Sequence, residues 1–214
     1  MRILVTAGPT RECIDSVRFI TNASSGQMGY CVAASAAAAG HDVTLLSGPV
    51  ALPTPPRCRR ADFVSVADLK KQLDEHFPHC DAIVMAAAVG DFTVANQSTA
   101  KLHRTGAGIS LTLVPTEDLL AGVGKIKREG QTIVAFAVED GSVEQIEAKA
   151  GRKLISKNAD YIVVNTPEAM AARESLAAIM SRDGLVLPWS RRAKDELANA
   201  IVALLAGGKI QSHR

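Results

Sequence analysis

Small residues open the segment that we expect to form the first long helix. The run from Asn22 to Gly29 reads NASSGQMG and joins a polar loop to an Ala-rich stretch. Ser24, followed three residues later by Gln27, matches a capping box and predicts a helix start here. Exposed amides at a helix N-terminus attract anions, and glycines let a phosphate approach the backbone. The segment is a candidate phosphate site, although an ordinary capped helix packed on a strand would show the same pattern.

A second cluster, AAAVGDF at Ala86 to Phe92, follows a run of buried-strand character. Ligands of open parallel sheets bind at the carboxyl ends of the strands, so Asp91 could meet a sugar hydroxyl there. An aspartate beside a glycine also commonly makes an Asx turn, which is the structural alternative.

Two groups of basic residues could neutralise an anion. Lys101, His103 and Arg104 lie in a polar stretch without periodicity, from 91 to 108, which could act as a lid. Lys149, Lys153 and Lys157 recur every four residues and predict a basic stripe on one helix face, one end of which could reach a nucleotide. In both groups, ordinary solvated side chains are the alternative. Phe136 and Glu139 are ambiguous in the same way, because Phe136 could be a core residue and Glu139 a carboxylate at a helix start.

Composition excludes several classes of protein. The 214 residues carry a formal net charge of only +2, which gives nucleic-acid binding no support. Four scattered cysteines and five histidines show no zinc-like spacing and suggest free thiols in the cytoplasm. No apolar run is long enough to span a membrane, which needs about 18 residues.

Short β-branched runs alternate with amphipathic segments, which predicts one α/β domain over 1–214. We expect a Rossmann-like three-layer fold, with a mostly parallel sheet, helices on both faces, and a small lid or dimerisation excursion at about 91–114. The predicted strands span 2–6, 42–47, a short stretch near 63, 81–87, 109–114, 132–137, 161–165, 176–180 and 185–187. The predicted helices span 26–39, 67–76, 116–127, 143–157 and 191–205.

Taken in order, several motifs resemble the phosphopantothenoylcysteine synthetase family, in its bacterial, CTP-dependent form. They are AGPTRE at 7–12, VRFITNASSGQMG at 17–29, LLSGPVALPTP at 45–55, AAAVGDF, AKLHR at 100–104 and SKNADYIVVN at 156–165. The resemblance covers about residues 3 to 205. It implies a ligase that joins L-cysteine to 4′-phosphopantothenate through an acyl-cytidylate, releasing CMP and pyrophosphate, in coenzyme A biosynthesis.

The resemblance also implies roles for individual residues. Asn22 and Lys101 match catalytic positions of the family. Residue matching implies a nucleotide site made of Ser24, Ser25, Gly26, Met28, Gly29, Ala86, Ala87, Asp91, Lys101, Phe136, Lys153 and Lys157. Arg18, Asn22, Ala87 and Ala88 match the phosphopantothenate end.

The implied cofactors are CTP, as a substrate, and Mg²⁺ carried by the nucleotide rather than by a dedicated protein cage. The implied partners are a second copy of the chain, in a homodimer, and a flavin-dependent phosphopantothenoylcysteine decarboxylase. The chain begins at the first strand of the resemblance, which suggests a stand-alone synthetase or half of a bifunctional enzyme.

Two other classes stay open at this stage. A nicotinamide-dependent oxidoreductase would suit the βαβ opening, but the GxGxxG spacing is missing from the first turn. A non-catalytic nucleotide-binding module would keep the fold without the chemistry, although Asn22 and Lys101 are both present.

Overall fold

The protein is built on one eight-stranded sheet, seen in a computed structural model that describes residues 1–104, 106, 108–166 and 174–208. In spatial order the strands are β12 (Gly184–Ala193), β11 (Glu174–Ser181), β10 (Tyr161–Asn165), β9 (Thr132–Val138), β6 (Ala82–Met85), β1 (Arg2–Ala7), β4 (Asp42–Ser47) and β5 (Cys58–Asp62). The six strands from β10 to β5 run parallel, and β11 and β12 extend the sheet with antiparallel pairs.

The parallel strands form where short apolar runs can be buried on both faces. Residues 3–7 of β1 and all four residues of β6 are buried. Because a strand covered on both sides needs apolar side chains at every position, these runs read as continuous rather than alternating.

Helices cover both faces of the sheet and create two separate apolar clusters. The first face carries α1 (Gln27–Ala38) and α5 (Lys194–Leu205), whose buried residues pack with Val5 and Val84. The opposite face carries α2 (Val66–His76), the short η1 (Phe77–His79), α3 (Leu119–Lys125) and α4 (Val143–Ser156). Together the layers give a Rossmann-like α/β fold, as predicted.

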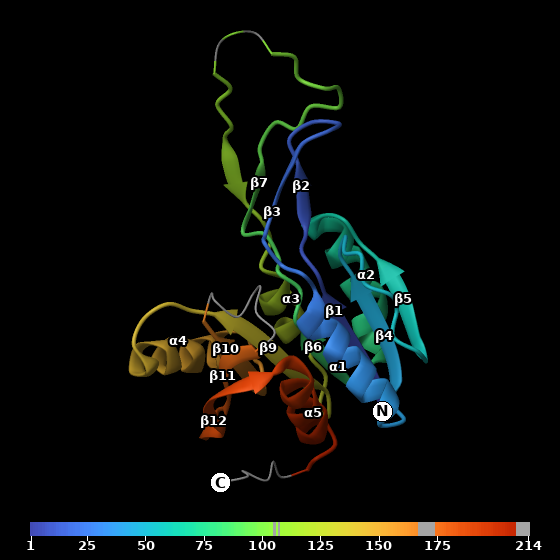
Figure 1. Ribbon diagram of the computed structural model, residues 1–214, viewed down its shortest axis with the longest axis vertical. Helices are drawn as coiled ribbons and strands as arrows, with labels where there is room; N and C mark the ends of the chain where they lie inside the picture. Colours follow the sequence, from blue (N-terminus) through green and yellow to red (C-terminus); the bar gives the residue numbers. More distant parts are fainter. Residues whose placement is uncertain (105, 107, 167–173, 209–214) are drawn as a thin grey trace.

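A long arm projects from the carboxyl edge of the sheet (Figure 1). It contains two antiparallel hairpins, β2 (Arg11–Cys13) with β3 (Phe19–Thr21), and β7 (Phe92–Val94) with β8 (Leu113–Pro115). The buried Asp15 carboxylate ties them together, because it pairs with Arg18 and accepts the Leu102 amide at 3.0 Å. These bonds hold the pKa of Asp15 well below its usual range, with the Arg18 contact as the main cause.

Several expected boundaries need correction. The first long helix begins at Gln27, and its N-cap is Gly26 in a left-handed conformation (φ 77°) without a side-chain cap, so the predicted capping box at Ser24 is wrong. The strand predicted at 109–114 is reduced to β8, and part of the predicted loop at 91–108 forms β7. The β2–β3 hairpin had no sequence prediction. Within the described part of the chain, no helix combines the length and apolar character needed to cross a membrane.

Candidate functional site

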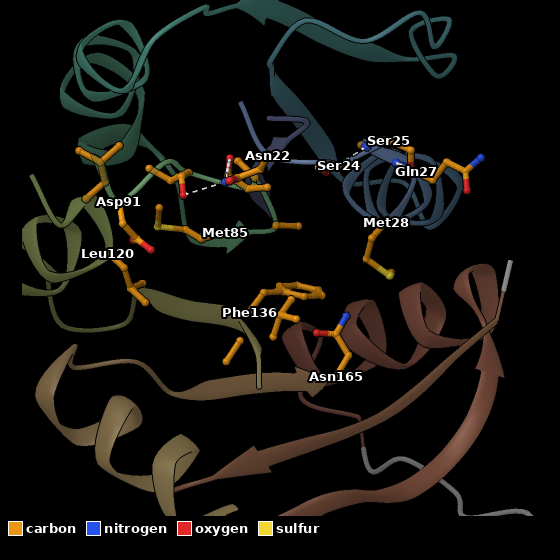
Figure 2. Close-up of a pocket in the computed structure, with 18 of the residues that line it drawn as sticks. Asn22, Ser24, Ser25, Gln27, Met28, Met85, Asp91, Leu120, Phe136 and Asn165 are labelled. Carbon is orange, nitrogen blue, oxygen red and sulfur yellow. Dashed lines mark hydrogen bonds between the residues drawn. The ribbon is translucent and has the colours of Figure 1, made fainter. Parts of the chain in front are cut away.

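A cavity of about 600 Å³ lies at the carboxyl edge of the parallel strands. Its walls come from the segment between β3 and α1, the end of β6 and the loop after it, the start of α3 and the end of β9 (Figure 2). Single residues of α4, β10, β11 and α5 complete the lining. From β1 the chain crosses to β4 on one side, whereas β6 pairs with the other side of β1. The cavity therefore occupies the point at which the strand order reverses, the usual ligand site of doubly wound sheets.

The N-terminus of α1 forms one wall of the cavity. Ser24, Ser25, Gly26, Gln27 and Met28 line it. The Ser24 hydroxyl accepts the Gly26 amide at 3.3 Å, and that of Ser25 accepts the Gln27 amide at 3.5 Å. Since the first four amides of a helix have no partner within the helix, this end presents donors and a positive partial charge to the cavity.

Two glycines shape this helix start for different reasons. A Cβ on Gly26 would lie 3.3 Å from the Cα of Gly8, and both residues have positive φ angles. A Cβ on Gly29 would lie 2.5 Å from the Cβ of Ala7, so Gly29 lets α1 approach β1 closely. Gly29 is therefore a packing residue and does not line the cavity.

The loop after β6 forms the floor, and its polar groups bond mainly within the protein. Asn22 Nδ2 donates to the carbonyl oxygens of Ala88 and Val89, both at 3.1 Å. The amides of Ala87 and Ala88 donate to Thr6 Oγ1 and to the Gly8 carbonyl. The side-chain amide of Asn22 thus holds the loop in place. An oxyanion would need the same amide as its hydrogen-bond donor.

The predicted basic residues of α4 already have acidic partners. Lys153 Nζ lies 2.6 Å from Glu139 Oε1, and Lys157 forms an ion pair with Asp118. Burial opposes ionisation of both carboxyl groups, but the lysines outweigh it and the pKa of each acid is lowered. A ligand at this end must compete with these pairs.

Most of the residues expected from sequence converge on the cavity, and four do not. The lining contains Asn22, Ser24, Ser25, Gly26, Met28, Ala86, Ala87, Ala88, Asp91, Phe136 and Lys153. Gly29, Arg18, Lys101 and Lys157 lie outside it. Lys101 is exposed on the arm, and Arg18 pairs with Asp15 there. The chemical roles given to all these residues stay predictions.

Sequence reasoning missed a polar wall made of Asn165, Ser175 and Lys194, which also lines the cavity. The Lys194 side chain is buried, and burial lowers its pKa. The buried Oδ1 of Asn165 has no hydrogen-bond partner among the described residues. One available signal was the position of Asn165, the last residue of a correctly predicted parallel strand. Within the described chain, no three His, Cys, Asp or Glu residues are grouped to hold a metal ion.

Comparison with known proteins places the chain among coenzyme A biosynthesis relatives. The bifunctional protein CoaBC of Escherichia coli K12 is 39% identical over 168 residues, which are 77% of this chain and 41% of that protein. A cysteine/cysteine sulfinic acid decarboxylase from an unknown prokaryotic organism is 39% identical over 206 residues, 94% of this chain and 56% of the relative. The chain thus spans about half the length of these relatives.

Solved structures agree over nearly the whole chain. The C-terminal domain of CoaBC is 33% identical, with a TM-score of 0.78 over 95% of this chain and 93% of that one. A DNA/pantothenate metabolism flavoprotein from Streptococcus pneumoniae is 25% identical, with a TM-score of 0.85 over 97% and 99%. These similarities support the fold over nearly the whole chain.

The comparisons correct the activity that the resemblance implied. The matching family model is described as the C-terminal domain of a flavoprotein, and a relative aligned with 94% of the chain is named a decarboxylase. On these descriptions, the assignment to phosphopantothenoylcysteine synthetase is overturned, as is the prediction of a CTP-dependent phosphopantothenate–cysteine ligase. CTP and Mg²⁺ as cofactors are overturned with it.

The family itself follows from the extent of the match. The model described as "DNA/pantothenate metabolism flavoprotein C-terminal domain" matches residues 1–207 of the 214. The match includes every strand of the main sheet and every segment that lines the cavity. The chain therefore belongs to the DNA/pantothenate metabolism flavoprotein C-terminal domain family.

Proposed function

We propose that the strand-end cavity binds a phosphate-bearing ligand of nucleotide size, and that the chain contributes this site to an enzyme of coenzyme A biosynthesis. The observation that carries the proposal is the N-terminus of α1, opened by Gly26, at the wall of a cavity of about 600 Å³. Helix N-termini bind phosphate groups, and this volume lies within the range of small-molecule sites. The relatives named for coenzyme A biosynthesis support the pathway.

A flavin is the cofactor that the family description implies, and the cavity suits one part of it well. The α1 amides fit the phosphate of flavin mononucleotide, and Phe136 and Met28 offer apolar contacts to a ring. The amides of Ala87 and Ala88 already donate within the protein, so they are not available as donors to ring oxygens. When bound, a flavin supplies oxidation–reduction chemistry.

The chain's own residues account for binding rather than for a bond-breaking step. Among the described residues that line the cavity, the groups able to move a proton are carboxylates and lysines, and the acids of the α4 end are already paired with lysines. The decarboxylase among the relatives is also almost twice as long as the aligned segment. We therefore assign this chain ligand binding and orientation.

The proposal is tested by calorimetric titration with flavin mononucleotide, the four ribonucleoside triphosphates, 4′-phosphopantothenate and inorganic pyrophosphate. We expect saturable binding of at least one, and at least tenfold weaker binding to Ser25→Asp, whose carboxylate would stand at the phosphate site. Ser142→Asp is the matched control, because Ser142 caps α4 and does not line the cavity. Absence of binding, or unchanged affinity in Ser25→Asp, would refute the proposal.

We also propose that the chain is one domain and forms a homodimer through its arm. Exposed apolar side chains concentrate there, including Phe92 and Ile109, each 53% exposed. Monomeric proteins rarely expose contiguous patches of this kind. Light scattering of the wild type should give a dimer mass, and Phe92→Ser should shift it toward the monomer, whereas Ile155→Ser on α4 should not. A wild-type monomer at all concentrations would contradict the dimer.

Two remaining predictions concern a partner protein and the location of the chain in the cell. We propose a flavin-dependent decarboxylase as a partner, because the relatives named CoaBC are bifunctional and longer than this chain. A cytoplasmic location is proposed on the same basis and is tested by fractionation.

A further inference from the structure

Lys194, the first residue of α5, is only 8% exposed although it lines the cavity. Sheet register explains its neighbours. Ser175 of β11 pairs with Arg192 of β12, two residues before Lys194, and Asn165 of β10 pairs with Ala177 of β11. Three polar side chains that are distant in sequence therefore meet at one edge of the sheet.

The two helices behind this wall start at the same edge of the sheet. Both β1 and β12 run toward the carboxyl edge, so α1 and α5 both start there and run side by side (Figure 1). The hydroxyl of Ser35 on α1 donates to Asn199 Oδ1 on α5 at 2.6 Å, which joins the two helices. The N-terminus of α1 and the Lys194 side chain thus face one cavity, an arrangement that favours an anion.

Acidic residues in the first turn of α5 bond to the backbone. Glu196 Oε2 accepts the Ala193 amide at 3.3 Å, and Asp195 Oδ1 accepts the Glu196 amide at 3.0 Å. Both carboxylates are on exposed residues, whereas Lys194 is buried. Lys194 lines the cavity as well as making contacts within the protein, so it can add a charge-assisted hydrogen bond to a ligand anion.

Asn165 adds an acceptor to these donors. Its Oδ1 is buried without a partner among the described residues, and Figure 2 shows the side chain beside Phe136 at the cavity. Buried polar atoms are normally hydrogen-bonded, so an orphan acceptor at a cavity calls for a donor from a ligand.

We propose that Lys194, Ser175 and Asn165 form a binding wall for the phosphoryl end of the ligand. Lys194 and Ser175 donate to phosphoryl oxygens, and Asn165 accepts from a hydroxyl or N–H group of the same molecule. The wall acts together with the α1 amides, and the inference rests on the proposed function above.

The test uses the full chain and inorganic pyrophosphate as the probe, with affinity measured by titration calorimetry. Lys194→Met should bind at least about tenfold more weakly, since a hydrogen bond to a charged group is lost. Lys194→Arg should recover part of the affinity. Lys149→Met is the control, because Lys149 pairs with Glu139 and does not line the cavity. Circular dichroism establishes that each variant is folded.

The outcomes separate the two proposals. If the wild type binds pyrophosphate and Lys194→Met binds it equally well, the wall is refuted and the proposed function stands. If the wild type binds no member of the panel, pyrophosphate included, both fail. Ser175→Ala provides a second variant if Lys194→Met does not fold, and we expect it to weaken pyrophosphate binding severalfold. Unchanged affinity in Ser175→Ala would refute the role of Ser175. If Lys194→Met does not fold, that result would also refute the wall.

Discussion

Replacing Gly29 by alanine tests how closely α1 must approach β1. The added Cβ would lie 2.5 Å from Ala7 Cβ and 2.8 Å from the Thr6 carbonyl oxygen. Carbon atoms in contact are normally about 3.5–4.0 Å apart, so α1 would have to move by about 1 Å. The Thr6 oxygen belongs to a central strand bonded on both sides and cannot yield easily.

Two opposing terms decide whether Gly29→Ala raises or lowers the free energy of unfolding. Overpacking a tight interior costs about 1–3 kcal/mol, while alanine in place of glycine within a helix gains about 0.8–1 kcal/mol. Because both contacts are shorter than 3.0 Å, the overpacking cost lies in the upper part of its range, about 2–3 kcal/mol. We therefore expect Gly29→Ala to lose about 1–2 kcal/mol net, which corresponds to about 2–8 °C in Tm for a domain of this size. Displacing the helix start should also weaken pyrophosphate binding.

Gly151 on α4 is the matched control, because a Cβ there meets nothing within 4 Å. Gly151→Ala should gain up to about 1 kcal/mol from helix propensity alone. Urea unfolding and calorimetry measure both variants. A Gly29→Ala protein as stable as the wild type would refute the close-packing argument.

Three further substitutions probe the arm, the cavity and the opposite end of the sheet. Asp15→Asn should speed amide exchange at Leu102, whose N–H donates to the carboxylate. In the wild type the low pKa of Asp15 keeps the carboxylate ionised and the tether complete at neutral pH, and the stability that the ionised group contributes is lost as the pH falls below about 4, the ordinary carboxyl value. Asn165→Leu removes an acceptor that has no partner in the described part of the chain. It should raise the Tm of the ligand-free protein while reducing the shift that pyrophosphate induces, and a lower Tm would contradict this. Lys127→Met leaves the partly buried Asp160 without the ammonium group 2.6 Å away and should lower the free energy of unfolding by about 1–3 kcal/mol, measured in urea; no change would show the pair to be neutral.

The sheet could be predicted because its signals are local. Runs such as Asp42–Ser47 and Tyr161–Asn165 were predicted with their observed boundaries, since β-branched residues between polar turns leave few alternatives. The start of α1 was misjudged because Ser24 and Gln27 satisfy a local capping pattern. Tertiary packing against Gly8 instead selects Gly26 as the cap.

The cavity was only partly predictable from sequence. The α1 segment and the β6 loop each carry recognisable small-residue motifs. Lys194 carries none, because its place at the cavity depends on β11 and β12 reversing direction before α5. Likewise, the pairing of Lys153 with Glu139 depends on how α4 docks, which no spacing rule specifies.

Because α1 and α5 start at the same edge of the sheet, the cavity between their N-termini is incomplete during synthesis of the chain. The first helix leaves the ribosome long before the last one, so a nascent chain has the α1 side of the cavity and lacks Lys194. A ligand that contacts both helices would consequently bind the completed chain more tightly than a nascent chain. It would also stabilise the early and late segments as a single cooperative unit.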